Sequence, residues 1–342
     1  MKRYLWVLAL TLLVACGNDR DMGGKVYLPQ FSLPNGESRV LIYNYPDLEY
    51  LGQIPAGSLA MRAAKRPGSH ELWVCCEASR DITLIDTRDD SLIKRFQIGN
   101  AASGGAFTPD GSLFVVGHGA QIIKRKGSAQ ASIVDAYSHK VLATFDVGAD
   151  PYNVAVSADG HEAYVANNGD HTITRIDLIE QRVLDTVETG PGPYSLTVDP
   201  AGDKLYVSCR GKDAESAGSF FIHTLPSLER IEHIASESHP VQFLKDADDC
   251  LLTEAKLGRS ASIRKISSDN LQSGASTWTL ELNADPGLAR VTDNGNWMLV
   301  TLGGSEIACV DLETGEVRSR RLLPNANQNH IALDLEVLEF SP

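Results

Sequence analysis

The sequence predicts an all-β fold in which one four-strand unit is repeated around a ring. Three observations predict it: short runs of β-forming residues, turns rich in glycine and aspartate between them, and a spacing of roughly 40 to 50 residues between equivalent turns. Short strands repeated at this spacing are typical of a β-propeller, in which each repeat forms one blade. Counting the repeats predicts a seven-bladed β-propeller of four-stranded antiparallel blades.

A short turn recurs along the chain, and an apolar run follows it each time. Glycine and aspartate accept the backbone conformations of tight turns, so we expect each turn to join the first two strands of a blade. The turns are Pro67-Gly68, Pro109-Asp110-Gly111, Ala158-Asp159-Gly160, Pro200-Ala201-Gly202, the degenerate Asp246-Ala247-Asp248-Asp249, and Asp293-Asn294-Gly295. The runs after them are Leu72–Val74, Leu113–Val116, Ala163–Val165, Leu205–Val207, Leu251–Leu252 and Trp297–Val300.

A third and a fourth strand complete each repeat. Several third strands end at an aspartate, as in Ile82–Asp86, Ile133–Asp135, Ile173–Asp177 and Ile307–Asp311. The ends of the fourth strands set the number of blades at seven, because they lie near Gly57, Gly99, Gly148, Gly190, Ser236, Asn283 and Asn325.

The two ends of the repeat region are incomplete in a complementary way. The segment Arg39–Ile54 holds outer strands with no inner strand before them, whereas Ile331–Phe340 is a lone strand with no blade after it. Pairing of the N- and C-terminal strands would close the ring and remove an exposed sheet edge. We therefore expect residues 25–342 to form a single propeller whose chain ends lie close together.

The first residues have the features of a bacterial export signal. Lys2 and Arg3 give a positive start, and the apolar run Leu5–Leu13 is too short to span a bilayer. The sequence Leu13-Val14-Ala15-Cys16 that follows resembles a lipobox, at which bacterial lipoproteins are cleaved and acylated. The resemblance implies a lipoprotein signal peptide over residues 1–15, lipidation of Cys16, and a short tether over residues 16–24.

This signal also predicts a location. The lipid would anchor the protein in the bacterial cell envelope with the propeller facing the periplasm, where a periplasmic or envelope protein is an available partner. Gly17, in place of aspartate, resembles the pattern that directs lipoproteins of enteric bacteria to the outer rather than the inner membrane.

Composition agrees with an exported body and limits its partners. Hydrophobic residues are 43% and charged residues 22%, which is ordinary for a globular protein. The formal net charge is −13, and removal of Lys2 and Arg3 with the signal takes it to −15. Such a body is repelled by phosphate backbones, so nucleic-acid binding is excluded as a function class.

The cysteines do not form the pattern of a disulfide-rich protein. Five remain once Cys16 is acylated, an odd number that leaves at least one thiol without an internal partner. They are scattered over the chain at Cys75, Cys76, Cys209, Cys250 and Cys309.

One repeat carries a family resemblance. The run Tyr152–Asp177, which contains Ala-Tyr-Val-Ala-Asn-Asn-Gly, resembles the YVTN-repeat β-propellers of bacteria and archaea. These are similar in turn to the d1-haem propeller of cytochrome cd1 nitrite reductase. Ala166 departs from the family pattern, which has threonine there. The resemblance implies the fold, but one fold hosts many unrelated functions.

The resemblance also implies where a ligand binds. In such propellers the ligand face is made by the loops between second and third strands and by the links into the next blade. In this sequence those loops hold more basic than acidic residues, which favours an anionic ligand. The basic residues are Arg80, Lys124, Arg125, Lys126, Arg210, Lys212, Lys256 and Arg259.

Side chains next to the expected channel mouth are the candidate ligand-binding residues. Aligning the repeats places some directly after second strands and others directly before first strands, where a ring of histidine, tyrosine and arginine could hold an anion or a haem iron. The candidates are His118, Arg210, Lys256, Tyr152, Tyr194, His239 and His330. No two histidines have the local spacing of a metal site, so no metal ligand is assigned.

We therefore expect an exported, lipid-anchored binding or scaffold protein for an anionic ligand or a partner protein, with no catalytic residue assigned. The first alternative is a protein that binds or handles a haem-type tetrapyrrole. Covalent c-type haem is excluded, because the sequence lacks Cys-x-x-Cys-His. A lactonase-type propeller enzyme is the weaker alternative, since the comparable phosphogluconolactonases are cytosolic.

Overall fold

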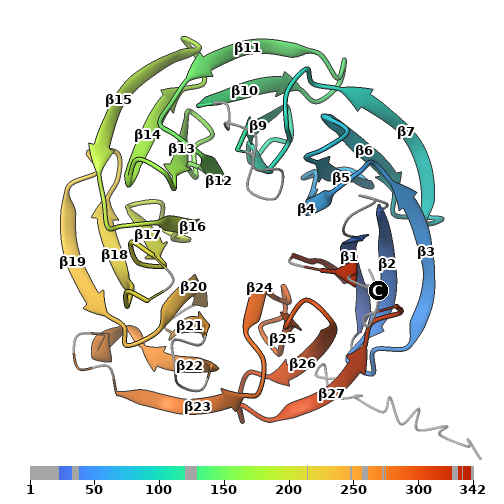
Figure 1. The fold of residues 1–342 in the computed structure, drawn as a ribbon, viewed down its shortest axis with the longest axis vertical. Helices are drawn as coiled ribbons and strands as arrows, with labels where there is room; N and C mark the ends of the chain where they lie inside the picture. Colours follow the sequence, from blue (N-terminus) through green and yellow to red (C-terminus); the bar gives the residue numbers. More distant parts are fainter. Residues whose placement is uncertain are drawn as a thin grey trace, which may run out of the picture.

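The chain folds as the predicted seven-bladed β-propeller. The computed structural model describes residues 23–32, 38–119, 129–213, 215–246, 249–255, 261–271, 273, 275–325, 330–332 and 334–339. The strands form separate antiparallel sheets that surround a central axis, with one edge strand of each sheet nearest the axis (Figure 1). The predicted fold class is confirmed.

Six blades are built from four consecutive strands, and each sheet keeps the order of the chain. Blade 1 is β4 (Ala60–Lys65), β5 (Glu71–Cys76), β6 (Asp81–Asp86) and β7 (Ser91–Gln97); blade 2 is β8 (Gly104–Phe107), β9 (Leu113–Gly117), β10 (Gln130–Asp135) and β11 (Val141–Asp146); blade 3 is β12 (Pro151–Val156), β13 (Glu162–Asn167), β14 (Thr172–Asp177) and β15 (Arg182–Glu188). Blade 4 is β16 (Pro193–Val198), β17 (Lys204–Cys209), β18 (Ser219–Thr224) and β19 (Arg230–Ala235); blade 5 is β20 (His239–Asp246), β21 (Asp249–Ala255), β22 (Ala261–Ser267) and β23 (Ser276–Leu282), with the short 3-10 helix η2 (Ser268–Asn270); blade 6 is β24 (Pro286–Val291), β25 (Trp297–Leu302), β26 (Glu306–Asp311) and β27 (Val317–Leu322).

Burial falls from the second strand to the outermost strand of a blade. In β13 every residue after Glu162 is buried, because neighbouring blades pack on both faces of this strand. In the outermost strand β11, exposed residues alternate with partly buried ones. The apolar runs recognised in the sequence are therefore the second strands, which are buried on both faces and need no polar alternation.

The predicted turns between first and second strands are present. Gly111, Gly160 and Gly202 have φ angles of +67°, +75° and +78°, which side chains rarely adopt. The Gly111 amide donates to the carbonyl of Thr108 at 2.8 Å, which closes the turn.

Apolar clusters join each blade to its neighbours. Between blades 1 and 2, the fully buried Trp73 contacts Phe114, with ring centroids 5.2 Å apart. Between blades 3 and 4, Tyr164 and Val207 belong to one buried cluster. The hydrophobic core is thus divided among the interfaces between blades and leaves the axis of the ring free for polar side chains.

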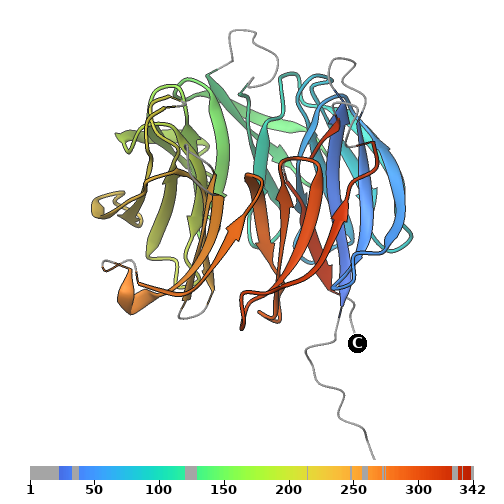
Figure 2. The same ribbon diagram turned by 60° about the horizontal axis from the view of Figure 1, so that its bottom comes forward.

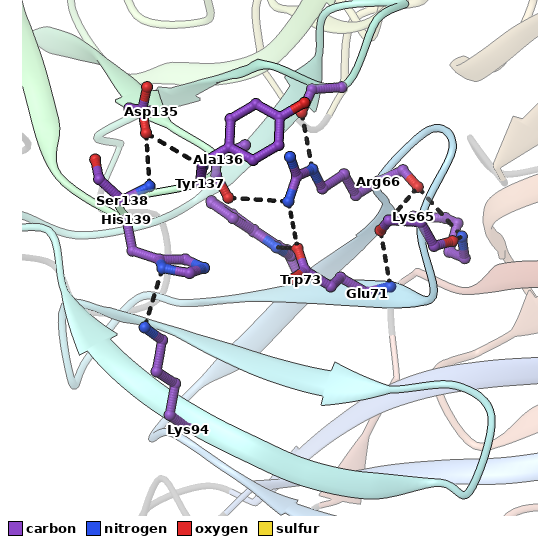
Figure 3. A network of polar contacts seen from close by, with 12 residues as sticks. Lys65, Arg66, Glu71, Trp73, Lys94, Asp135, Ala136, Tyr137, Ser138 and His139 are labelled. Atoms are coloured by element: carbon purple, nitrogen blue, oxygen red, sulfur yellow. Dashed lines mark hydrogen bonds and ion pairs between the residues drawn. The ribbon is translucent and has the colours of Figure 1, made fainter.

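A buried arginine adds polar contacts between blades 1 and 2 (Figure 3). Arg66 donates from Nε to the carbonyl of Gly111 at 2.8 Å and from Nη1 to the carbonyl of Ala136 at 3.0 Å. It pairs with Glu71 at 2.9 Å, and its guanidinium lies 4.1 Å from the ring centroid of Tyr137. The arginine satisfies carbonyl groups of the next blade that would otherwise lack donors at this interface.

The last sheet, the closing blade, combines both ends of the chain. Three of its strands are N-terminal: β1 (Gly24–Ser32), β2 (Ser38–Tyr45) and β3 (Tyr50–Ala56). Its inner edge is C-terminal and interrupted, formed by β28 (His330–Ile331) and β29 (Glu336–Glu339), which both pair antiparallel with β1. The predicted closure by terminal strands is confirmed, and Figure 1 shows these segments from the two ends of the chain in one sheet.

The strand β1, which is the second strand of the closing blade, was not predicted from the sequence. Nearly every residue of β1 is buried, so it lacks polar alternation, and Pro29 within it argues against a central strand. In the structure β1 pairs with β29 over Gly24–Tyr27 and with β28 over Phe31 and Ser32. Pro29 therefore lies opposite the interruption between these two strands, where its missing N–H costs no hydrogen bond on that side.

The two faces of the ring differ in their connections. We call the side with the connections between second and third strands the loop face, and the side with the turns between first and second strands the turn face. As a second strand, β1 begins at the turn face, and the end of β29 pairs with that beginning, so both described chain ends lie on the turn face (Figure 2). Within the described ranges, no helix is long and apolar enough to cross a membrane.

All five cysteines of the propeller are buried and free, which agrees with the predicted absence of a disulfide framework. Burial raises the pKa of the Cys209 thiol to about 12. Burial likewise raises the pKa of Cys75, Cys76 and Cys309, so these four thiols are protonated at neutral pH and act as small apolar side chains.

Candidate functional site

Two tyrosines and two arginines form a stack at the axis of the ring. The hydroxyl groups of Tyr152 and Tyr194 are 2.9 Å apart, and their ring centroids are 4.5 Å apart. The guanidinium of Arg62 lies 4.5 Å from the Tyr152 centroid, and that of Arg210 lies 4.4 Å from the Tyr194 centroid. The structure therefore brings together three of the predicted residues, Tyr152, Tyr194 and Arg210, and adds Arg62.

First strands of different blades position this stack. Tyr152 and Tyr194 are the second residues of β12 and β16, near the loop face, and Arg210 directly follows β17. Figure 1 shows β4, β12 and β16 among the strands nearest the axis. Arg62 reaches Tyr152 across blade 2 because Gly104 has no side chain: a Cβ there would lie 2.5 Å from the Arg62 Cδ.

The two arginines give the stack its positive charge. Arg62 is 7% exposed, and burial disfavours its charged form, yet the oxygens of Tyr152, Asp334 and Tyr194 outweigh this effect and raise its pKa. Burial also raises the pKa of Tyr152, so this phenol stays neutral. Among the described residues, neither Arg62 nor Arg210 forms an ion pair, so the site can attract an anion.

His239 supports the arginine on the loop face. It is the first residue of β20, and its Nδ1 lies 2.5 Å from the carbonyl oxygen of Arg210. An N–H at Nδ1 donates to this carbonyl and fixes the backbone after β17. His239 thus lies beside the stack, as the sequence predicts.

The alignment that placed His118 beside Arg210 was wrong. The amide of His118 donates to the carbonyl of Gln130 at 2.9 Å, which extends the ladder between β9 and β10 by one residue. The side chain is therefore inside blade 2 and not at the channel mouth. It is 1% exposed, with Nε2 2.7 Å from the hydroxyl of Ser132 and Nδ1 2.6 Å from the carbonyl of Ala101.

His118 occupies the same position as Asn167 in blade 3. Asn167 donates from Nδ2 to the hydroxyl of Thr174 at 2.9 Å, which in turn contacts Thr186 on the outermost strand. Through the hydroxyl group on the third strand, each of these side chains connects the second strand of its blade to the third and fourth strands. Burial lowers the pKa of His118, which keeps it neutral in this structural role.

Several predicted site residues lie outside the described residues. Lys256 is one, and so are Cys16 and the whole signal segment. The backbone of His330 belongs to β28, but its side chain is not described. The basic loop residues that also lie outside are Lys124, Arg125, Lys126 and Arg259.

Sequence reasoning missed a polar cavity on the turn-face side of Arg62. Its volume is about 320 Å³, and residues of all seven inner edges line it. Its charged residues are Arg62, Lys65, Arg290, Asp334 and Glu336. The available signal was a charged residue within an otherwise small and apolar first strand, as for Arg62 in Ala-Met-Arg-Ala-Ala, because arginine is rarely buried without a partner.

The chemistry of the described site is that of hydrogen-bond donation and positive charge. Within the ranges that the structure describes, no group of three histidine, cysteine or acidic side chains is arranged to hold a metal ion. The stack offers guanidinium donors, phenol hydroxyls and aromatic ring faces.

Comparisons with known proteins support the fold. No protein family and no curated protein matches the sequence. A hydrazine synthase chain of Kuenenia stuttgartiensis is similar in structure, with a TM-score of 0.68 and 16% identity, over 83% of this chain and 96% of that one. A functionally unknown protein from Desulfotomaculum acetoxidans has a TM-score of 0.72 and 12% identity, over 91% of this chain and 98% of that one. At these identities the likeness establishes the propeller fold alone.

Proposed function

We propose that this chain is an exported, lipid-anchored binding protein whose central channel holds an anionic ligand. One observation carries the proposal: Arg62 and Arg210 lie on the outer faces of a hydrogen-bonded tyrosine pair and form no ion pair among the described residues. A guanidinium held over a ring is already positioned, so less side-chain entropy remains to be lost when an anion binds.

The negative charge of the rest of the chain restricts the binding of anions to this site. The whole chain has a formal charge of −13, so an anion is repelled by most of the surface and attracted only where positive charge is concentrated. The ligand would contact guanidinium N–H groups through charge-assisted hydrogen bonds, which are stronger than neutral ones.

Lipid attachment at Cys16 would also orient the ring. Seven residues separate Cys16 from Gly24, and a fully extended tether of that length reaches about 25 Å. Because β1 begins at the turn face, that face would lie toward the membrane. Tyr194 and Arg210 would then face the periplasm, where a soluble ligand or an envelope protein could reach them.

We also propose that this chain is related to the YVTN-repeat propellers. A tetrapyrrole role has less support, because one candidate iron ligand, His118, is bonded within blade 2 and His239 is bonded to the Arg210 carbonyl. The similarity to a hydrazine synthase chain concerns the fold and carries no activity to this protein.

Reversing the charge of Arg210 should weaken anion binding without unfolding the protein. Sulfate, pyrophosphate and citrate would be titrated by calorimetry into the wild type and into Arg210→Glu, at low and at physiological salt. A charge-assisted hydrogen bond contributes roughly 1.5–3 kcal/mol, so affinity for the best probe should fall about 10- to 100-fold. The melting temperature should change little, because a partly exposed charge usually affects stability by about half a kcal/mol.

The matched control is Arg182→Glu, which makes the same charge change at an exposed position at the start of β15. We expect the control to bind the probes like the wild type. Equal affinities for wild type and Arg210→Glu would place any anion site elsewhere and contradict the proposal.

A further inference from the structure

The wall of the cavity between Arg62 and the turn face carries both hydrogen-bond donors and hydrogen-bond acceptors. The cavity is lined by the first strands of blades 1 to 6, by Asp334 and by Glu336 at the start of β29. Its volume of about 320 Å³ lies at the lower end of the range for small-molecule sites. It shares only Arg62 with the tyrosine–arginine stack, since neither tyrosine lines it.

Two carboxamide groups on this wall are oriented as donors. Asn153 Oδ1 accepts from the amide of Leu196 at 3.1 Å, and Gln242 Oε1 accepts from the amide of Ala289 at 2.7 Å. A backbone N–H requires an acceptor, so the oxygens of both side chains are fixed. Their NH2 groups are left for the cavity, together with the guanidinium of Arg62.

A buried carboxylate, that of Asp334, also lines the wall. Asp334 is 1% exposed, and neither of its oxygens accepts a hydrogen bond among the described residues. Asp334 forms an ion pair with Arg290, whose Nη2 lies 3.3 Å from Oδ1, and its charge also helps to raise the pKa of Arg62. Arg290 is shared with Glu336, whose Oε2 lies 3.3 Å from Nε. A buried carboxylate in this state is a strong acceptor with unused capacity.

The groups with unused hydrogen-bonding capacity are therefore opposite in charge. Glu336 is paired with Arg290, and Lys65 donates from Nζ to the carbonyl of Arg66 at 3.2 Å. Arg62 and Asp334 are left with free hydrogen-bonding capacity inside one cavity. A plain anion would accept hydrogen bonds from the donors but give none to Asp334, whereas a plain cation would donate to Asp334 and leave the donors without an acceptor.

We propose that this cavity binds a small zwitterion with one carboxylate and one ammonium group. The carboxylate contacts Arg62 and the NH2 groups of Asn153 and Gln242, and the ammonium donates to Asp334. Such a ligand satisfies both sets of buried groups at once, which water alone does less strongly because it carries no charge.

The test compares each zwitterion with the anion and the cation that remain when one of its two charged groups is removed, on the full-length protein. Glycine, β-alanine and γ-aminobutyrate offer increasing charge separation, and each is matched with its anion (acetate, propionate or butyrate) and its cation (methyl-, ethyl- or propylammonium). Calorimetry should find at least one zwitterion that binds tenfold or more tightly than its matched anion and cation. Asp334→Asn should remove this tenfold preference, whereas Asp89→Asn, the same change at an exposed turn, should keep it.

The outcomes separate this site from the proposed anion site. Arg210→Glu should leave zwitterion binding unchanged, because Arg210 does not line the cavity. If a matched anion binds as tightly as its zwitterion, the cavity takes anions only, and the zwitterion proposal fails while the anion site stands. If no probe binds, the cavity holds water, and the proposal also fails. The comparison on the wild type decides between these outcomes even where Asp334→Asn does not fold.

Discussion

Deletion of residues 331–342 should unfold the propeller or leave it close to unfolding at room temperature. The deletion removes β29 and with it the pairing to Gly24–Tyr27 of β1, which takes away the strand that closes the ring and exposes the inner edge of β1. It also removes Leu335, which is fully buried in the cluster between blade 6 and the closing blade.

The expected loss is comparable to the whole stability of a domain. Burial of a side chain such as Leu335 contributes roughly 1.5–3 kcal/mol. The deletion also removes Ala332, which is buried in the same cluster, and Arg290, whose side chain is 29% exposed, would lose its ion pairs with Asp334 and Glu336. Domains are stable by only about 5–15 kcal/mol.

Urea denaturation followed by circular dichroism measures this effect. Two point variants give a matched comparison: Leu335→Ala should cost about 2–5 kcal/mol, whereas Leu322→Ala, at a side chain that is 60% exposed, should cost little. A deletion variant that unfolds at the same urea concentration as the full chain would contradict the closure by β29.

Cys16→Ser should abolish lipid attachment completely, because acylation requires the thiol. The protein should then appear unprocessed or in the soluble periplasmic fraction instead of the membrane. Mass spectrometry of the N-terminal peptide, together with membrane fractionation, measures both effects. A single acyl chain holds a protein only marginally, so stable attachment of the wild type should depend on several chains.

Asn18→Ser is the control for this prediction, since it makes a polar change in the same segment and keeps the thiol. It should remain acylated and membrane-bound. An acylated N-terminal peptide from Cys16→Ser would end the lipoprotein hypothesis and, with it, the proposed orientation of the loop face toward the periplasm.

The repeat made the fold predictable from the sequence. A tight turn followed by a doubly buried second strand produces the same local signal in each complete blade, as at Gly111 and Gly160. The closing blade was only partly predictable, because β1 is buried along its length and contains Pro29. The position of β1 depends on pairing with strands roughly 300 residues away in the sequence. A local sequence pattern cannot indicate such a pairing.

The candidate site was predictable only where position in the repeat fixes the direction of a side chain. Tyr152 and Tyr194 are equivalent residues of neighbouring blades, so both point to the axis as expected. His118 was misplaced by one residue, and in a strand a shift of one residue reverses the direction of the side chain. Arg62 was missed because its role depends on Gly104 and Tyr152, in the next two blades.

The central claim, that the tyrosine–arginine stack holds an anionic ligand, is tested most directly by native mass spectrometry of protein purified from the membranes of its own host. Wild-type protein should carry an additional small mass that is released as an anion. The double variant Arg62→Gln, Arg210→Glu should be folded and lack that mass. A wild type without any bound mass, or a double variant that retains the same mass, would contradict the claim, and a Soret band in the same sample would point to a tetrapyrrole instead.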